Sequence, residues 1–272
     1  MTDQPITPQQ MSLTIGGPDQ AREIAILNRV AADSASAPVL VWLGGYRSDM
    51  TGTKAAELDT FAAARGLGAI RFDYSGHGAS GGAFRDGTIS RWLEESLAVL
   101  DHLAPQNVIL VGSSMGGWIA LRLAQELRRR GNGPRIAGMV LIAPAPDFTS
   151  ELIEPHLTEE QRRSLAERGF FEEISEYSPE PNIYTRALLE DGLQNQVLTG
   201  ILETGCPVHI LQGMQDPDVP YRHALKLVEF LPAEDVVLTL IRDGDHRLSR
   251  PQDIEKMLAA VETLINHDLK MS

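Results

Sequence analysis

The chain has 272 residues, a length that allows one large domain or two small ones and buries enough surface to fold without disulfides or metal ions. Its 43% hydrophobic and 22% charged residues are ordinary for a soluble globular protein and argue against wholesale disorder. A formal net charge of −13 argues against nucleic-acid binding and against general binding to anionic membranes.

Several absences from the sequence limit the chemistry and the location of the protein. The single cysteine, Cys206, permits no internal disulfide and no cysteine-based zinc cluster. No H-E-x-x-H motif or histidine cluster occurs, so the sequence gives little support to a metalloenzyme. No apolar run reaches the roughly 18 residues that span a bilayer, and residues 1–10 lack the basic and apolar regions of a signal peptide. We therefore expect a cytoplasmic protein without stable membrane insertion.

Strand-like apolar runs alternate with helical patterns along most of the chain. In chain order, the sequence predicts an antiparallel pair at residues 12–15 and 23–29, then buried strands at residues 39–45, 68–74, 108–113, 138–143, 208–213 and 236–242. Apolar spacing predicts helices over residues 89–100, from residue 115 to a stop at Gly131, and over residues 253–269. Strands that are apolar on both faces need helices on both sides of the sheet. The predicted fold is therefore a three-layer α/β sandwich with a mostly parallel sheet.

Residues 146–199 interrupt this alternation, and we predict that they form a small helical lid between core segments 1–145 and 200–272. They contain no strand-like run, and their twelve acidic and four basic residues carry most of the net negative charge. Most of these charges are interpreted as a solvated outer face. The apolar side chains of this segment are predicted to face the sheet and to roof an apolar pocket: Leu152, Ile153, Leu157, Phe170, Phe171, Ile174, Tyr177, Tyr184, Leu188 and Leu189.

A G-x-S-x-G motif lies between the predicted strand 108–113 and the helix that follows it. The motif reads Gly112-Ser113-Ser114-Met115-Gly116, and only Ser114 has glycines at both flanking positions. A serine on such a strand-to-helix turn exposes its hydroxyl above the sheet, and the glycines prevent collisions across the turn. The helix that begins here also directs its positive end toward the reacting group. Ser114 is therefore the candidate nucleophile.

A serine nucleophile needs an adjacent base that is itself held by a third group. In a fold with the serine on such a strand-to-helix turn, the partners follow along the chain in the order serine, acid, histidine. This order selects His246, which lies in the loop 243–247 after the last predicted strand. The other six histidines precede the serine or lie in the lid, a strand or helical patterns: His77, His102, His156, His209, His223 and His267.

The acid is expected just beyond the preceding strand, where two aspartates occur. Asp216 is preferred, because Asp218 is then available to shape the turn or cap the next helix. Asp218 remains an alternative, as do Asp243 and Asp245, although Asp245 is adjacent to His246 and sequence neighbours on an extended loop usually diverge.

Two backbone N–H groups are needed to stabilise the negative oxygen that forms during attack on an acyl carbonyl. One is expected from Met115, the residue after the nucleophile, and the other from Tyr46 in the turn after strand 39–45. Gly45 would permit close approach of the substrate. Trp118, one turn into the helix, is interpreted either as a substrate contact or as a core residue.

At this point the chain resembles the α/β-hydrolase superfamily over nearly its whole length. The resemblance is carried by LGGYRSDMTGTKA (43–55), RFDYSGHGASGG (71–82), ILVGSSMGGW (109–118), LQGMQDPDVP (211–220) and GDHR (244–247). These segments look like the branch that includes palmitoyl-protein thioesterase and mycophenolic acid acyl-glucuronide esterase, with bacterial relatives. In two places the chain departs from the pattern, because Gly44-Gly45 and Gln212-Gly213 stand where His-Gly is common.

The resemblance implies a serine hydrolase of esters or thioesters that uses no metal or cofactor. It places the nucleophile, acid and base at Ser114, Asp216 and His246, and the oxyanion turn at Gly45-Tyr46. We expect a small-molecule ester or thioester as substrate, S-acylated proteins included. The alternatives are a carbon–carbon bond hydrolase, a perhydrolase on the same three residues, and a non-catalytic ligand-binding receptor of this fold. The oligomeric state is left open.

Overall fold

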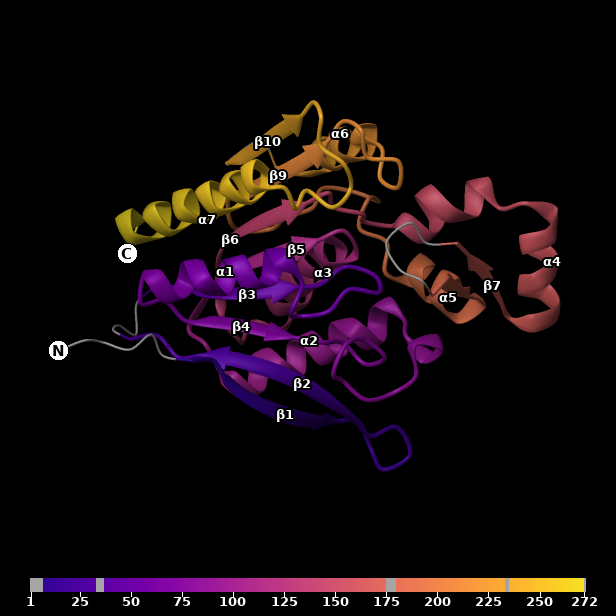
Figure 1. The fold of residues 1–272 in the computed structure, drawn as a ribbon, viewed down its shortest axis with the longest axis horizontal. Helices are drawn as coiled ribbons and strands as arrows, with labels where there is room; N and C mark the ends of the chain where they lie inside the picture. The colour runs from indigo at the N-terminus through magenta and orange to yellow at the C-terminus, as the bar shows by residue number, and fades with distance from the viewer. Residues whose placement is uncertain (1–6, 33–36, 175–179, 233–234, 272) are drawn as a thin grey trace.

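An eight-stranded sheet forms the centre of the structure, a computed structural model that describes residues 7–32, 37–174, 180–232 and 235–271 (Figure 1). The strand order is β1-β2-β4-β3-β5-β6-β9-β10. In chain order these strands are β1 (Gln9–Ile15), β2 (Arg22–Arg29), β3 (Val39–Leu43), β4 (Ala69–Phe72), β5 (Asn107–Ser113), β6 (Arg135–Ile142), β9 (Val208–Gly213) and β10 (Val236–Ile241).

The pairing of the strands confirms the predicted, mostly parallel sheet. All neighbours from β4 to β10 pair in parallel, and only β1 with β2 and β2 with β4 pair antiparallel. The predicted N-terminal pair is also confirmed, with Ser12 opposite Ala25. The central strands are buried on both faces, which is why they read as continuous apolar runs rather than as alternating ones.

Helices cover both faces of the sheet and give the predicted three layers. Alternate residues of β3 show this, since Val41 belongs to the core cluster that contains residues of α2, α3 and α6, and Trp42 belongs to the one that contains residues of α1 and α7. The covering helices are α1 (Thr53–Ala64), α2 (Ile89–Leu103), α3 (Met115–Arg130), α6 (Tyr221–Phe230) and α7 (Pro251–Met271), with a short 3₁₀ turn at Phe84–Asp86. Helix α3 ends at Gly131, whose φ of +66° is a left-handed conformation, as the stop signal predicted.

Residues 146–174 and 180–199 lie beyond the ends of the sheet toward which its parallel strands point (Figure 1). The expectation that this segment lacks strands is wrong, because β7 and β8 pair as an antiparallel hairpin. In chain order the segment contains a π turn (Thr149–Ile153), a 3₁₀ turn (Glu154–His156), α4 (Glu159–Arg168), β7 (Phe170–Glu173), β8 (Asn182–Thr185) and α5 (Arg186–Gln194).

The apolar residues of this segment are only partly buried as predicted. Phe171, Leu188 and Leu189 are buried, and Leu152, Ile153 and Tyr184 pack against the core. The prediction that Ile174 faces the sheet is wrong, because this residue, directly after β7, is 92% exposed. The guanidinium groups of Arg85 and Arg168 both lie over the ring of Phe170, 4.1 and 4.2 Å from its centroid. Tyr177 lies outside the described residues.

The carboxyl ends of the parallel strands bring the predicted site residues to one edge of the sheet. Tyr46 follows β3, Ser114 follows β5, Asp216 follows β9 and His246 follows β10. Loops at this edge are the usual site of ligand binding in open α/β sheets. The order of the strands, rather than nearness in sequence, therefore assembles the site.

Candidate active site

Ser114 occupies a strained turn between β5 and α3. Its φ of +54° and ψ of −118° lie in a region that non-glycine residues rarely adopt, at a cost of about 1–3 kcal/mol. Two glycines make the turn possible: a Cβ at Gly112 would lie 2.4 Å from the Gly116 carbonyl oxygen, and one at Gly116 would lie 2.0 Å from that of Leu43. The Ser114 N–H donates to the Ile142 carbonyl at 2.9 Å, which ties the turn to β6. The neighbouring backbone therefore enforces the conformation of the serine.

The three predicted polar side chains meet at this turn. His246 Nε2 lies 3.1 Å from Ser114 Oγ, and His246 Nδ1 lies 2.8 Å from Asp216 Oδ2. The Asp216 side chain is fully buried and that of His246 is 16% exposed, so the imidazole stands between a buried carboxylate and a half-buried serine. With Nδ1 donating to the carboxylate, Nε2 is free to accept the serine proton.

Asp216 is held by backbone and side-chain donors on both of its oxygens. Oδ1 accepts the N–H groups of Asp218 and Val219 at 2.9 and 2.8 Å, and Oδ2 accepts Gln212 Nε2 at 3.1 Å in addition to His246. In the sequence, Gln212 stands out only as a departure from a family pattern, and nothing there predicts its hydrogen bond to Asp216. The carboxylate is thereby fixed in the orientation that faces the imidazole.

The alternative acids have other partners or other orientations. Asp243 pairs with Arg250 at 2.8 Å, and Asp245 accepts the Leu248 N–H at 2.9 Å within its own loop. Asp218 is exposed, and its backbone N–H supports the carboxylate of Asp216. The structure thus brings the carboxylate of Asp216, and none of the other three carboxylates, into the hydrogen-bond chain with His246 and Ser114.

The two predicted N–H donors lie on either side of Ser114. Met115 is the first residue of α3, where an N–H has no carbonyl partner within the helix. On the other side, a Cβ at Gly45 would lie 3.4 Å from Ser114 Cβ, so the turn after β3 passes directly beside the serine. The Tyr46 N–H that follows donates to no group among the residues that the structure describes.

Of the two interpretations of Trp118, the structure supports the core residue and not the substrate contact. Its side chain is fully buried, and the indole N–H donates to the Asn195 carbonyl at 3.0 Å. The ring meets Phe148 edge-on, with centroids 5.5 Å apart. Trp118 therefore offers no surface to a substrate in this structure. It packs instead against Phe148 and Asn195, which belong to the segment after β6.

The side chain of Tyr46 joins the sheet edge to the hairpin of β7 and β8. Its ring stacks on Tyr184, with centroids 5.4 Å apart and planes 7° apart, and its hydroxyl donates to the Ile183 carbonyl. Burial raises the pKa of the Tyr46 hydroxyl well above its usual range, so it remains a donor at neutral pH. Next to it, Arg47 pairs with Glu180 at 2.9 Å. An aromatic, largely apolar surface therefore lies against the turn beside Ser114.

Lys54, which the sequence did not single out, supports the loop that carries His246. Its amine, at the start of α1, donates to the Arg247 carbonyl. Burial is the main cause that lowers the pKa of this amine to about 8, and the positive charge of Arg247 adds to it. Because the contact is made to a backbone oxygen, no side-chain pattern in the sequence predicts it.

Within the described ranges, one group of side chains has the spacing of metal ligands: Asp216, Asp218 and His246, with ligand atoms within 4.8 Å of one another. Two of these three already form the hydrogen-bond chain with Ser114. In the same ranges, no helix combines the length and hydropathy needed to cross a bilayer.

Comparison with known proteins gives relatives for nearly the whole chain. Residues 40–257 match the model of the alpha/beta hydrolase family. The chain is 31% identical over 233 residues to mouse palmitoyl-protein thioesterase ABHD10, mitochondrial, covering 84% of this chain and 75% of the mouse protein. That name places the mouse protein in mitochondria, and the cytoplasmic location expected for this chain stays a prediction.

Solved structures agree with these relatives. A crystal structure of a protein from Agrobacterium vitis S4 is 68% identical, with a TM-score of 0.93 over 95% of this chain and 99% of that one. The structure of alpha/beta hydrolase domain-containing protein 10 from mouse is 27% identical, with a TM-score of 0.81 over 96% of this chain and 100% of that one. The overall fold is therefore shared with these proteins.

Proposed function

Because the chain belongs to the alpha/beta hydrolase family, we propose that it is a serine hydrolase that cleaves carboxylic esters and thioesters. The observation that carries this proposal is the hydrogen-bond chain from Ser114 through His246 to the buried Asp216, with contacts of 3.1 and 2.8 Å. Such a chain makes a neutral serine nucleophilic, because the imidazole accepts its proton while the carboxylate stabilises the resulting cation.

The proposed reaction proceeds through an acyl-enzyme. His246 Nε2 takes the proton of Ser114 as Oγ attacks the acyl carbonyl, and the oxygen of the tetrahedral intermediate accepts the N–H groups of Met115 and Tyr46. His246 then gives its proton to the leaving alcohol or thiol. Water, deprotonated by the same imidazole, attacks the acyl-serine and releases the acid, which restores the hydroxyl of Ser114.

The surroundings of Ser114 favour neutral, apolar acyl groups. Tyr46, beside the serine, stacks on Tyr184 and meets Phe148 edge-on, which provides aromatic surface on that side of the site. The predominantly acidic segment of residues 146–199 disfavours heavily anionic substrates, although salt weakens such an effect. Neutral alkyl or aryl esters and S-acyl thioesters, S-acylated proteins included, are therefore the proposed substrates. The name of the mouse relative, a palmitoyl-protein thioesterase, supports the thioester part.

The test is hydrolysis of p-nitrophenyl esters and matched S-acyl thioesters with acyl chains from C2 to C16, with Ser114→Ala as the blank. We expect turnover by the wild-type protein and its loss in Ser114→Ala, together with labelling of the wild-type serine by a fluorophosphonate probe. Wild-type rates in Ser114→Ala would refute the serine mechanism. A protein that neither labels nor turns over any substrate would instead fit the ligand-binding receptor. A steep fall in kcat/KM beyond C4 would exclude a long acyl pocket.

A further inference from the structure

The turn after β3 uses its successive N–H groups in three different ways. The Ser48 N–H closes the turn on the Gly45 carbonyl at 3.1 Å. The Arg47 N–H donates to His77 Nε2 at 3.2 Å, across 30 residues of sequence. The Tyr46 N–H, which precedes both of them and follows Gly45 beside Ser114, has no partner in the part of the chain that the structure describes. The direction of the Tyr46 peptide is therefore set by its neighbours rather than by a bond of its own.

Arg47 needs such an external contact, because its own conformation is unfavourable. Its φ of +55° is left-handed, which costs a non-glycine residue about 1–2 kcal/mol. The hydrogen bond from its N–H to His77 offsets part of that cost and fixes the plane of the peptide that follows Tyr46. Since this plane and that of the Tyr46 N–H meet at the Tyr46 Cα, rotating one redirects the other.

His77 is built to accept that N–H. Its Nδ1 faces the Ser75 carbonyl at 3.2 Å, where only a donor fits, so the neutral ring carries its proton on Nδ1 and leaves Nε2 as an acceptor. The ring is 3% exposed and packs against Tyr74, Phe84 and Trp92. Burial lowers the pKa of His77 to about 4, so the acceptor is kept at neutral pH.

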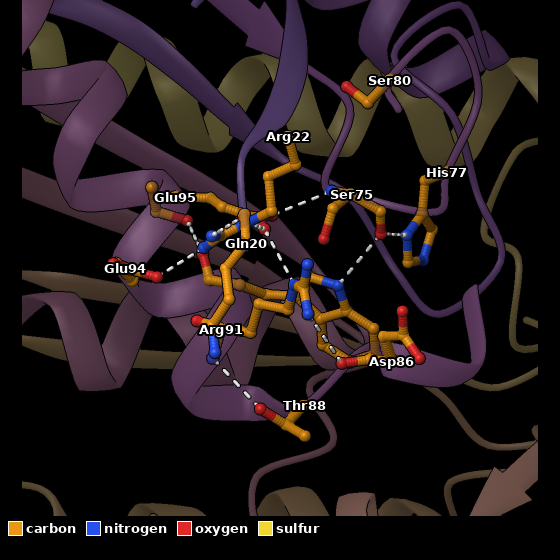
Figure 2. Close-up of polar contacts among 12 residues, drawn as sticks. Gln20, Arg22, Ser75, His77, Ser80, Asp86, Thr88, Arg91, Glu94 and Glu95 are labelled. Carbon is orange, nitrogen blue, oxygen red and sulfur yellow. Dashed lines mark hydrogen bonds and ion pairs between the residues drawn. The ribbon is translucent and has the colours of Figure 1, made fainter. Parts of the chain in front are cut away.

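A buried ion pair holds the backbone on which His77 depends (Figure 2). Glu95, fully buried on α2, pairs with Arg22 of β2 and also accepts the Ser75 N–H at 2.8 Å. The Ser75 carbonyl, which receives His77 Nδ1, also accepts the indole N–H of Trp92 at 3.3 Å. The acceptor of the Arg47 N–H thus rests on a buried, hydrogen-bonded part of the core.

A second contact joins the same two loops. The buried carboxylate of Asp73 accepts the Met50 N–H at 2.6 Å through Oδ1 and the Ala79 N–H at 2.8 Å through Oδ2. The loop after β4 therefore binds the loop after β3 at both ends of residues 47–50, with His77 at the end next to Ser114.

We propose that His77 is a positioning residue for the oxyanion site. By accepting the Arg47 N–H, His77 Nε2 holds the preceding Tyr46 N–H toward the negative oxygen that forms on the substrate when Ser114 attacks its carbonyl carbon. This role rests on the proposed function, since it concerns a donor of the same reaction. His77 itself contacts neither the serine nor the reacting carbonyl in the proposed mechanism, and acts only through the turn.

Three substitutions separate this role from a merely structural one. His77→Gln retains an amide oxygen at about the reach of Nε2, whereas His77→Asn retains only a polar group near the position of Nδ1, and His77→Phe keeps the ring volume alone. The control is His102→Asn, an exposed histidine at the end of α2. The assay measures kcat and KM on one p-nitrophenyl ester, with thermal unfolding to confirm that each protein is folded.

We expect His77→Asn and His77→Phe to lower kcat by about 10- to 100-fold with KM within about 2-fold, because the lost alignment matters in the transition state and not in the bound substrate. His77→Gln is expected to recover kcat to within about 5-fold of the wild type. Folded Asn and Phe variants with wild-type kcat, or a Gln variant as slow as Asn, would overturn the role of His77. Should His77→Phe fail to fold, the comparison of Asn with Gln decides alone. Failure of the proposed function is separate, since it shows as turnover by Ser114→Ala.

Discussion

Replacing Asp216 with asparagine reverses the hydrogen bond to His246 and removes one acceptor of Gln212 Nε2, while it leaves the shape of the side chain almost unchanged. In the structure, Oδ1 accepts two backbone N–H groups, from Asp218 and Val219, and Oδ2 accepts His246 Nδ1. An amide NH₂ group cannot accept those backbone donors, so in Asp216→Asn the amide oxygen must stay with them. The NH₂ group then faces His246 and donates where a carboxylate used to accept.

The consequence is the wrong tautomer of His246. Its Nδ1 becomes the acceptor and its Nε2 carries the proton, yet Nε2 is the atom that lies 3.1 Å from Ser114 Oγ. A protonated Nε2 cannot take the serine proton. The same exchange in serine proteases lowers kcat by about 10⁴-fold, which corresponds to about 5.4 kcal/mol of transition-state stabilisation. We expect a loss of this size here, with little change in KM.

The assay is steady-state hydrolysis of the best ester of the panel by Asp216→Asn and Asp218→Asn, with Ser114→Ala as blank. Asp218→Asn keeps the backbone N–H that supports Asp216, so its kcat is expected within about 3-fold of the wild type. Asp216→Asn within 10-fold of the wild-type kcat would refute the reasoning. A severe loss in Asp218→Asn alone would transfer the role of the acid to Asp218.

Two further predictions concern stability. The pKa of His77 is lowered to about 4 in the folded protein and is about 6.5 in an unfolded chain, so the unfolded state binds more protons below pH 6.5. The contribution of His77 to the free energy of unfolding should therefore fall by about 3 kcal/mol between pH 6.5 and 4, and His77→Gln should remove that part of the pH dependence in urea titrations. The same dependence of the free energy of unfolding on pH in both proteins would contradict this prediction. Gly116→Ala would place a methyl group 2.0 Å from the Leu43 carbonyl oxygen and should lower the free energy of unfolding by about 3 kcal/mol or prevent folding. The control Gly200→Ala, with no atom within 4 Å of the added methyl group, should leave the free energy of unfolding within about 0.5 kcal/mol of the wild type. Similar urea midpoints for both variants would argue against a crowded turn at Ser114.

The main sheet could be predicted because its strands are long and apolar on both faces. The runs at residues 108–113 and 208–213 have few interpretations other than buried strands. The strands β7 and β8 escaped prediction because they have four residues each, FFEE and NIYT, and half of those residues are polar. They are strands because they pair with each other, and pairing between short segments leaves no periodic signal in either one.

The candidate site was predicted where the sequence constrains position, and missed where orientation decides. Ser114, Asp216 and His246 each follow a recognisable strand, so the topology of the sheet brings them to one edge. The sequence left Trp118 open between a substrate contact and a core residue, because residues 115–121 are all buried and no polar face indicates which side of α3 points inward. The contacts of Lys54 and Gln212 could not be predicted either, since their partners are a backbone oxygen and a carboxylate on other loops or turns.

His77 shows why a rule based on chain order excludes one role and leaves another open. The rule discards it as the base because it precedes Ser114, and the structure places it away from the hydrogen-bond chain of the serine and against the N–H of Arg47. The two proposed N–H donors are then fixed by independent means: that of Met115 by the first turn of α3, and that of Tyr46 by the loop after β4. A change at His77 misaligns one donor of two and leaves the base intact. Its expected cost of about 10- to 100-fold therefore stays well below the about 10⁴-fold expected for Asp216→Asn, which disables the base itself.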